Sequence, residues 1–162
     1  MILMKVIVVS DTHGRIDDFI SKINSMEKPQ LIIHLGDYVE DGEKIKSITK
    51  VGTIIVKGNG DYFNKTYKDD EVIYIGGKRF FITHGHKYGV KYGLNNLLYR
   101  GEEVGADIIL FGHTHAPLIV KDSNIMIMNP GSASYPRGIE RKKTFGIIEI
   151  EEAVSMRIEK IN

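Results

Sequence analysis

The chain has 162 residues, of which 42% are hydrophobic and 27% are charged, and this composition predicts a single globular domain spanning residues 1–162. Its 22 basic and 21 acidic residues leave a net charge of +1, which argues against a general nucleic-acid binder because such proteins carry a basic patch. The absence of cysteine excludes disulfides, thiolate nucleophiles and cysteine-ligated metals, and no stretch approaches the ~18 apolar residues of a membrane span, so we expect a soluble, cytoplasmic protein.

The first half of the chain alternates between strand and helix patterns. Residues 2–9 form an apolar, β-branched run that is typical of a strand buried on both faces, and residues 31–35 and 53–56 repeat it. Apolar residues at three- and four-residue spacing over 16–26 predict a helix, and a shorter helix is predicted at 43–48. This order predicts a parallel sheet.

The second half reads mainly as hairpins. Residues 72–75 and 79–83 flank Gly76-Gly77, a two-residue turn, and a second hairpin is predicted from 118–121 and 125–128. A helix is predicted over 90–100, followed by strands at 107–111, 145–150 and 155–159. Together the elements predict an α/β protein in which two mixed sheets pack together with helices outside, a four-layer αββα sandwich.

Metal-capable side chains follow the ends of five predicted strands. In chain order they are Asp11 and His13, Asp37, Asn59, His84 and His86, and His113 and His115. Ligand sites in open α/β sheets lie outside the carboxyl ends of the strands, so these side chains can meet in one crevice. The set of oxygen and nitrogen donors is too large for one ion and fits two ions that share a carboxylate.

Five ordered motifs carry a resemblance to a known family. They are Asp11-x-His13, Gly36-Asp37, Gly58-Asn59-x-Asp61, Thr83-His84-Gly85 and Gly112-His113-x-His115. They resemble the calcineurin-like metallophosphoesterases, and in particular the small, cap-less YfcE-type phosphodiesterases, over residues 5–137. Each motif alone is weak, but five in order at strand ends are specific. The resemblance implies hydrolysis of phosphate esters by a hydroxide that bridges two metal ions.

The resemblance also implies a role for each ligand. One divalent ion would be held by Asp11, His13 and His115, and the other by Asn59, His84 and His113. Asp37 would bridge the two ions. The resemblance implies Mn²⁺ as the activating ion, although a donor set of oxygens and imidazoles also suits Ni²⁺, Zn²⁺, Fe²⁺ or Co²⁺.

Other residues of the predicted site would act around the metals. Asp61 would accept hydrogen bonds that orient a ligand, and Asn59, His86 and Arg137 would contact the substrate. Many relatives carry a histidine directly after the asparagine as a proton donor, where this chain has Gly60. Either His86 takes that role or the leaving group departs without strong help, which favours diesters and activated esters as substrates.

Several of these residues also have a structural interpretation. Asp11 could cap a helix, Asp37 could belong to a turn, and Asn59-Gly60 resembles a hairpin turn; their joint placement at strand ends favours ligation instead. Arg137 could equally be a surface residue. His34 lies within an apolar strand, and we expect it to be buried and hydrogen-bonded.

Two functions remain after this reading. The first is a metal-dependent phosphodiesterase or phosphatase that acts on a small phosphate ester. The alternative is an inactive scaffold on the same fold, because the family includes a retromer subunit that uses the fold to bind proteins. All seven predicted ligands are present, which favours the enzyme. The resemblance implies that a dimer or tetramer is plausible, but the sequence itself does not establish the oligomeric state.

Overall fold

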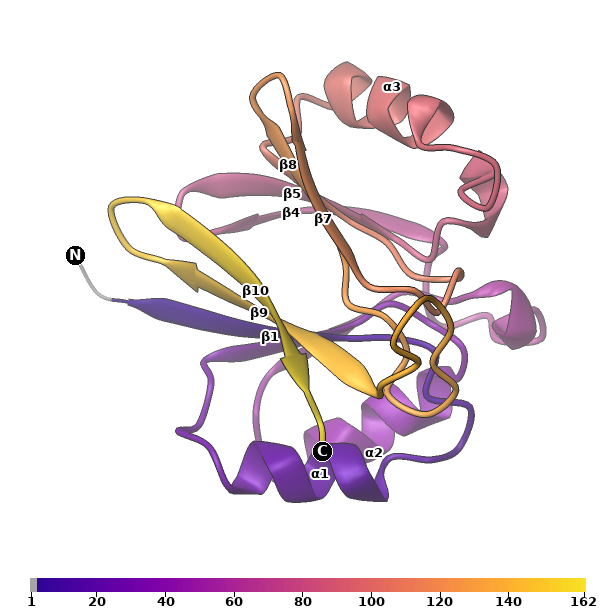
Figure 1. The fold of residues 1–162 in the computed structure, drawn as a ribbon, viewed down its shortest axis with the longest axis vertical. Coiled ribbons are helices and arrows are strands. Elements are labelled where there is room, and N and C mark those ends of the chain that lie inside the picture. The colour runs from indigo at the N-terminus through magenta and orange to yellow at the C-terminus, as the bar shows by residue number, and fades with distance from the viewer. Residues whose placement is uncertain (1–2) are drawn as a thin grey trace.

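The computed structural model describes residues 3–162 and contains two five-stranded sheets (Figure 1). The first sheet has the order β10-β9-β1-β2-β3. Its parallel part comprises β1 (Met4–Val9), β2 (Leu31–His34) and β3 (Thr53–Ile55). The hairpin of β9 (Thr144–Ile150) and β10 (Val154–Lys160) extends it antiparallel to β1. The predicted first strand includes Ile2, which lies outside the described residues.

The second sheet has the order β4-β5-β6-β8-β7. β4 (Asp70–Ile75) and β5 (Lys78–Thr83) form the predicted hairpin around Gly76-Gly77. β6 (Ile108–Leu110) pairs in parallel with both β5 and β8 (Ile125–Asn129). β7 (Leu118–Asp122) forms an edge antiparallel to β8.

Three helices cover the outer faces of the two sheets. α1 (Asp17–Asn24) and α2 (Val39–Thr49) lie on the first sheet, and α3 (Asn95–Glu103) lies on the second (Figure 1). Two short 3₁₀ turns, η1 (Asn59–Asp61) and η2 (His86–Tyr88), follow β3 and β5. No described helix is long and apolar enough to cross a membrane.

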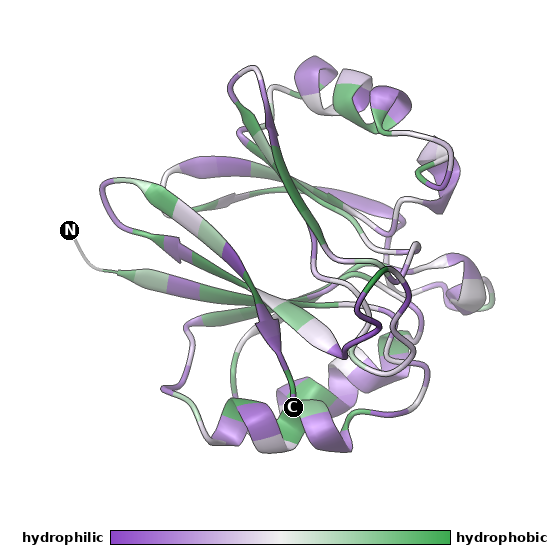
Figure 2. Ribbon diagram, viewed as in Figure 1, coloured by the Kyte–Doolittle hydropathy of each residue, from purple (hydrophilic) through white to green (hydrophobic). Residues whose placement is uncertain are grey.

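Three apolar clusters separate the layers. Val8 and Leu110 belong to the cluster between the sheets, whereas Ile7 belongs to the cluster beneath α1 and α2, because alternate residues of a strand point to opposite faces. Leu97 of α3 packs with Ile109 in the third cluster. Figure 2 shows green hydrophobic stretches in the strands of both sheets, interrupted by hydrophilic segments, and mixed colouring on the helices. The predicted four-layer αββα sandwich is confirmed.

The predicted helix over residues 90–100 is wrong at its start, because α3 begins only at Asn95. Gly89 and Gly93 have φ values of 60° and 144°, which lie outside the right-handed helical region. The segment between them is therefore a turn. The short helix predicted at 43–48 is longer than expected, since α2 spans Val39–Thr49.

Candidate metal centre

The strand ends predicted to carry ligands meet at one edge of the molecule. β1, β2 and β3 run parallel in the first sheet, and β5 and β6 run parallel in the second. Their carboxyl ends therefore face the same region, on the right of Figure 1. Five of the predicted ligands form two groups whose donor atoms lie within 4.8 Å of one another, namely Asp11, His13 and His115, and Asp11, Asp37 and His84.

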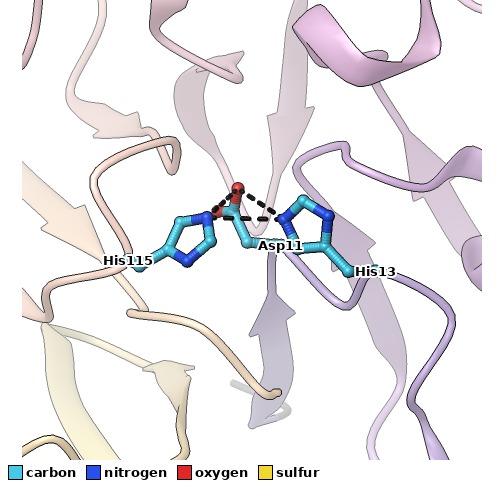
Figure 3. Close-up of side chains that lie close together, drawn as sticks. All are labelled: Asp11, His13 and His115. Atoms are coloured by element: carbon cyan, nitrogen blue, oxygen red, sulfur yellow. Dashed lines mark hydrogen bonds and ion pairs between the residues drawn. The ribbon is translucent and has the colours of Figure 1, made fainter. Parts of the chain in front are cut away.

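Asp11 lies at the centre of both groups. Its Oδ1 atom is 3.2 Å from His115 Nε2, 3.6 Å from His84 Nε2 and 4.0 Å from His13 Nε2. The Nε2 atoms of His13 and His115 are 3.4 Å apart, and the three side chains point toward one another (Figure 3). The Asp11 side chain is fully buried, and its Oδ1 has no hydrogen-bond partner among the described residues.

The second carboxylate oxygen of Asp11 is occupied by protein donors. Ser10 Oγ donates to Oδ2 at 2.6 Å, and the His113 backbone N–H donates to it at 3.0 Å. Asp37 shows the same division, because its Oδ1 accepts from the Gly60 N–H at 2.9 Å. Each carboxylate is thus anchored by one oxygen and presents the other.

The oxygen that Asp37 presents faces two of the same imidazoles. Asp37 Oδ2 is 3.5 Å from His84 Nε2 and 3.9 Å from His13 Nε2. His84 therefore lies between the two carboxylates. Two acidic groups and three histidines converge here, and within residues 3–162 neither carboxylate pairs with a lysine or arginine.

Backbone carbonyls fix the tautomers of two of these histidines. His84 Nδ1 is 2.7 Å from the Leu35 carbonyl, and His115 Nδ1 is 2.7 Å from the Tyr135 carbonyl. A carbonyl only accepts, so each Nδ1 carries the hydrogen and each neutral ring presents its Nε2 lone pair. Those lone pairs face the Oδ1 lone pairs of Asp11. Such an arrangement is favourable only if a proton or a metal cation lies between the atoms.

Unpaired polar atoms are concentrated in this region. Among residues 3–162, the buried side-chain atoms without a hydrogen-bond partner are Asp11 Oδ1, His84 Nε2 and His86 Nδ1. Buried polar atoms are nearly always paired in folded proteins. The first two are oxygen and imidazole donors of the kind that divalent transition metals bind, and the residues therefore fit a metal site.

The electrostatics of the site favour a charged Asp11 and a neutral His113. Burial acts to raise the pKa of Asp11, but contacts with His115, His84 and Ser10 outweigh it and lower the pKa to about 2. Burial and the neighbouring His84 lower the pKa of His113 to about 4. Neutral imidazoles are the form that binds metals.

The contact with Asp11 has the opposite effect on His115. Burial acts to lower the pKa of His115, but its interaction with the Asp11 carboxylate outweighs burial and raises the pKa. In the absence of a cation, a proton on His115 therefore stabilises the pair. A bound metal would compete with that proton.

Left-handed backbone conformations are common at the predicted ligands. The residues Asp11, His13, Asp37, His113 and His115 have φ values of 55°, 46°, 48°, 71° and 60°. This conformation costs a non-glycine residue about 1–2 kcal/mol. Strain of this kind is found where surrounding structure holds a functional site in place.

Hydrogen bonds from a distant turn hold the Asp11 backbone. The hydroxyls of Ser132 and Ser134 both donate to the Asp11 carbonyl, at 2.8 and 2.9 Å. Ser10 and Ser134 were not predicted from the sequence. No spacing or composition signal marks these two serines, because each acts through one contact that exists only in the fold.

Glycines in the motifs allow close approach to the carboxylates. A Cβ on Gly58 would lie 2.1 Å from Asp37 Oδ1, and a Cβ on Gly112 would lie 2.2 Å from Ser10 Oγ and 2.8 Å from Asp11 Oδ2. No side chain fits at either position. The Gly-Asn and Gly-His pairs of the sequence thus have a steric reason.

Asp61 holds the backbone around Asp37. Its Oδ2 accepts from the N–H groups of Asp37 and Gly58, both at 2.8 Å, and its Oδ1 accepts from Val39 N–H at 3.0 Å. Asp41, which the sequence did not single out, likewise accepts from the Gly14 N–H at 2.7 Å. Both buried carboxylates position loops that carry predicted ligands.

Three predicted site residues lie at the periphery of the two groups. The His113 ring is 5.2 Å from the His84 ring, and the His86 ring is 5.5 Å from it, measured between centroids. Asn59 is exposed at the start of η1. Burial and the nearby His84 lower the pKa of the half-buried His86.

Arg137 and two tyrosines border the site. The Arg137 backbone N–H donates to the His115 carbonyl at 2.9 Å, and Arg137 lines a pocket of about 500 Å³ with His13 and His115. The rings of Tyr38 and Tyr135 lie 5.6 and 5.7 Å from the His13 ring. Arg137 is exposed, so its side chain is open to a ligand in this pocket.

His34 is buried and hydrogen-bonded, as expected from its apolar strand. Its Nδ1 accepts from the Gly36 N–H at 3.1 Å, which leaves Nε2–H to donate to Thr12 Oγ1 at 2.9 Å. Burial lowers its pKa to about 4, against the opposing charge of Asp41. His34 therefore hydrogen-bonds to the loops that carry Thr12 and Gly36, and it belongs to neither donor group.

Comparisons with known proteins agree on one kind of protein. A family model described as a calcineurin-like phosphoesterase superfamily domain matches residues 4–153. The probable metallophosphoesterase YsnB of Bacillus subtilis is 37% identical over 95% of this chain and 89% of its own length. The phosphodiesterase YfcE of Escherichia coli is 27% identical over 84% of this chain and 83% of its own.

Solved structures share the fold over nearly the whole chain. A predicted phosphoesterase from Streptococcus pneumoniae has a TM-score of 0.83 with 30% identity, and covers 99% of this chain and 91% of its own. Vacuolar Protein Sorting 29 from Cryptosporidium parvum has a TM-score of 0.78 with 18% identity, over 99% and 100%. The second likeness shows the fold alone.

Proposed function

This chain belongs to the calcineurin-like phosphoesterase superfamily, and we propose that it hydrolyses small phosphate diesters with the help of two divalent metal ions. The family acts on phosphate esters and binds divalent metals, and the two Asp/His groups described above would hold such ions. We propose Mn²⁺ as the activating ion, with Ni²⁺, Zn²⁺, Fe²⁺ and Co²⁺ as alternatives that suit the same donors.

The proposed ligands divide between two ions. Asp11, His13 and His115 would hold one ion, and His84, His113 and Asn59 would hold the other, with Asp37 shared between them. The first three donor atoms already lie within 4.8 Å of one another. The Asp11–Asp37–His84 group supports a carboxylate shared between sites, and it gives Asp11 a larger part in the sharing than the sequence implied.

The observation that carries this proposal is the close approach of the imidazole Nε2 atoms of His84 and His115 to Asp11 Oδ1. That atom and His84 Nε2 are buried and unpaired, 3.6 Å apart. The other ring nitrogen of His84, Nδ1, is already hydrogen-bonded to the Leu35 carbonyl. A buried carboxylate facing unprotonated imidazoles is costly, and a divalent cation between them removes that cost. A purely structural role for these residues leaves the cost unexplained.

The metals would supply charge neutralisation at phosphorus and a water of lowered pKa. The residues of this chain would hold them and position the ester. The Arg137 guanidinium is exposed beside His115 and can bind a phosphoryl oxygen bidentately. Asn59, at the start of η1, can donate its amide to the same group.

The leaving group has two options in this site. His86 lies beside His84, and burial together with that neighbour lowers its pKa, which reduces the protonated fraction from which it could donate. Gly60 offers no side chain. Diesters with good leaving groups need no donor, and we therefore propose diesters and activated esters as the preferred class. Replacing His86 with alanine should slow poor leaving groups more than good ones if His86 donates.

The alternative is a scaffold with no catalytic activity. Vacuolar Protein Sorting 29 shares the fold, so the fold alone does not decide between the two functions. The retained donor groups support the enzyme, and the hydrolysis assay separates the two functions.

A direct test is hydrolysis of bis-p-nitrophenyl phosphate by chelator-treated protein after addition of each candidate metal. We expect turnover with Mn²⁺ and two ions bound per chain by elemental analysis. Asp11→Asn and His84→Ala should each lose both the turnover and the bound metal. Glu27→Gln, at an exposed residue remote from these groups, serves as the control. Absence of turnover with every metal would favour the scaffold.

A further inference from the structure

A groove beside the candidate centre is not used by the proposed reaction. Its volume is about 640 Å³, and it is lined by residues 116–119, the loop of residues 137–142, Thr144, and Ile158 and Lys160 of β10. Sites for small molecules usually enclose about 300–1,000 Å³. The groove is therefore large enough for an organic group that extends beyond a phosphate.

The groove and the pocket at the metal centre share Arg137 as a lining residue. Arg137 lines both cavities, and the smaller one also contains His13 and His115. The Arg137 N–H donates to the His115 carbonyl at 2.9 Å, which fixes the junction of the two cavities. Ala116 and Pro117 follow His115 directly and form the start of the groove wall. A ligand bound at the centre can therefore extend past Arg137.

The walls of the groove offer exposed apolar surface. Leu118 and Ile119 are each 37% exposed, and the Ile139 side chain is wholly in solvent. Ile158 adds a half-buried surface from β10. Single exposed apolar residues are common, but a group of them lining one concave surface indicates a binding site.

The rim of the groove is strongly basic. Lys160 pairs with Glu140 at 2.9 Å, whereas Arg137, Arg141 and Lys142 form no ion pair within 4 Å among residues 3–162. Four basic residues and one acidic residue line the groove, although the whole chain carries a net charge of only +1. The local excess of positive charge favours an anionic ligand.

We propose that this groove binds the far part of the substrate, and that it selects diesters whose second alcohol is apolar and ends in another anionic group. The apolar walls would contact the body of that group, and Arg141 and Lys142 would pair with its terminal anion. This inference rests on the proposed function, because Arg137 places the scissile phosphate at the junction. It names the class of substrate that the metal centre alone leaves open.

The chain contains no tryptophan, so Ile139→Trp places a single fluorescent reporter in the groove. Two ligands should be titrated into chelator-treated Ile139→Trp protein: bis(4-carboxyphenyl) phosphate, with terminal anions, and diphenyl phosphate, without them. We expect the carboxylated diester to bind roughly fivefold more tightly, as about two exposed ion pairs would provide. The difference should shrink as salt is added.

Arg141→Glu/Lys142→Glu should abolish this difference, and Lys28→Glu/Lys46→Glu should preserve it, because Lys28 and Lys46 are exposed and line neither the groove nor the centre. Far-UV circular dichroism verifies that each variant is folded. Equal affinity for the two diesters, or a preference that survives reversal at 141 and 142, would overturn the proposal. A groove variant that changes the sedimentation of the chain without such a preference would instead identify an interface between copies.

The titration uses metal-free protein and does not depend on turnover. If bis-p-nitrophenyl phosphate is not hydrolysed with any metal, the proposed function fails and the groove measurement still stands. If hydrolysis occurs but the two diesters bind equally, only the substrate class is wrong.

Discussion

Replacement of Asp61 by asparagine tests how the fold positions the centre. The Asp61 carboxylate is buried and accepts three backbone hydrogen bonds, from Asp37, Gly58 and Val39. An asparagine has nearly the same shape but only one accepting oxygen. Placed at Oδ2, that oxygen keeps the bonds from Asp37 and Gly58. The amide NH₂ then faces the Val39 N–H, donor against donor.

The magnitude follows from these contacts. One hydrogen bond to a charged group contributes about 1.5–3 kcal/mol, and the two remaining bonds weaken when the charge is lost. We therefore expect Asp61→Asn to lower the free energy of unfolding by about 3 kcal/mol, a large share of the 5–15 kcal/mol of a typical domain. Metal affinity should fall about 10- to 100-fold, because the weakened bonds from Asp37 and Gly58 hold the ligand-bearing loop less firmly.

Urea unfolding followed by far-UV circular dichroism measures the stability of chelator-treated protein, and metal titration against a chelating dye measures affinity. Asp107→Asn is the matched control, since the exposed Asp107 accepts a single backbone bond from Arg79 at 2.8 Å, and it should cost less than about 1 kcal/mol. If Asp61→Asn and the control lose equal stability and bind metal alike, the assigned role of Asp61 is wrong.

Three further predictions address the same loops. Gly58→Ala should destabilise the chain by roughly 1–3 kcal/mol and abolish metal-dependent hydrolysis, because its Cβ would overlap Asp37 Oδ1. Gly52→Ala is the control and should be neutral in the same urea assay, because a Cβ at Gly52 would meet nothing within 4 Å. Adding Mn²⁺ at a hundred times its Kd should raise the thermal midpoint by about 5–10 °C over chelated protein, and an unchanged midpoint in calorimetry would contradict metal binding. Burial lowers the pKa of His34 from its ordinary value of 6.5 to about 4 in the folded chain. As the pH drops from 6.5 toward 4, the unfolded chain therefore takes up a proton at His34 before the folded chain does, and the free energy of unfolding should fall. At pH 5 the loss should be about 2 kcal/mol relative to pH 7; His34→Gln should show a shallower decline in metal-free urea titrations, and an identical slope would refute the assignment.

The strand ends were predictable from the sequence because two local signals coincide there. An apolar run such as residues 4–9 predicts a buried strand, and metal-capable residues such as Asp11 follow several such runs. Parallel strands then bring these residues to one edge. The resemblance to a metallophosphoesterase added the assignment of roles, and the family itself is confirmed.

Other features required the fold itself. The start of α3 at Asn95 depends on the φ values of Gly89 and Gly93, and a glycine allows such values without dictating them. Ser134 reaches the Asp11 carbonyl across 123 positions of the chain. Contacts of this kind leave no periodicity in the sequence, because a single hydroxyl is involved and serine is common in loops.

The central carboxylates illustrate how a nearly neutral chain can hold concentrated charge. Asp11 and Asp37 each use one oxygen to accept backbone or hydroxyl hydrogen bonds and present the other to the imidazoles. The anchoring bonds orient each carboxylate before any ion arrives, so little side-chain freedom is lost on binding. The left-handed conformations of both residues are needed for this orientation and cost stability in the metal-free protein. A cation that binds only the folded chain would offset that cost, which explains why the largest gain in stability is expected from the metal rather than from further packing of the core.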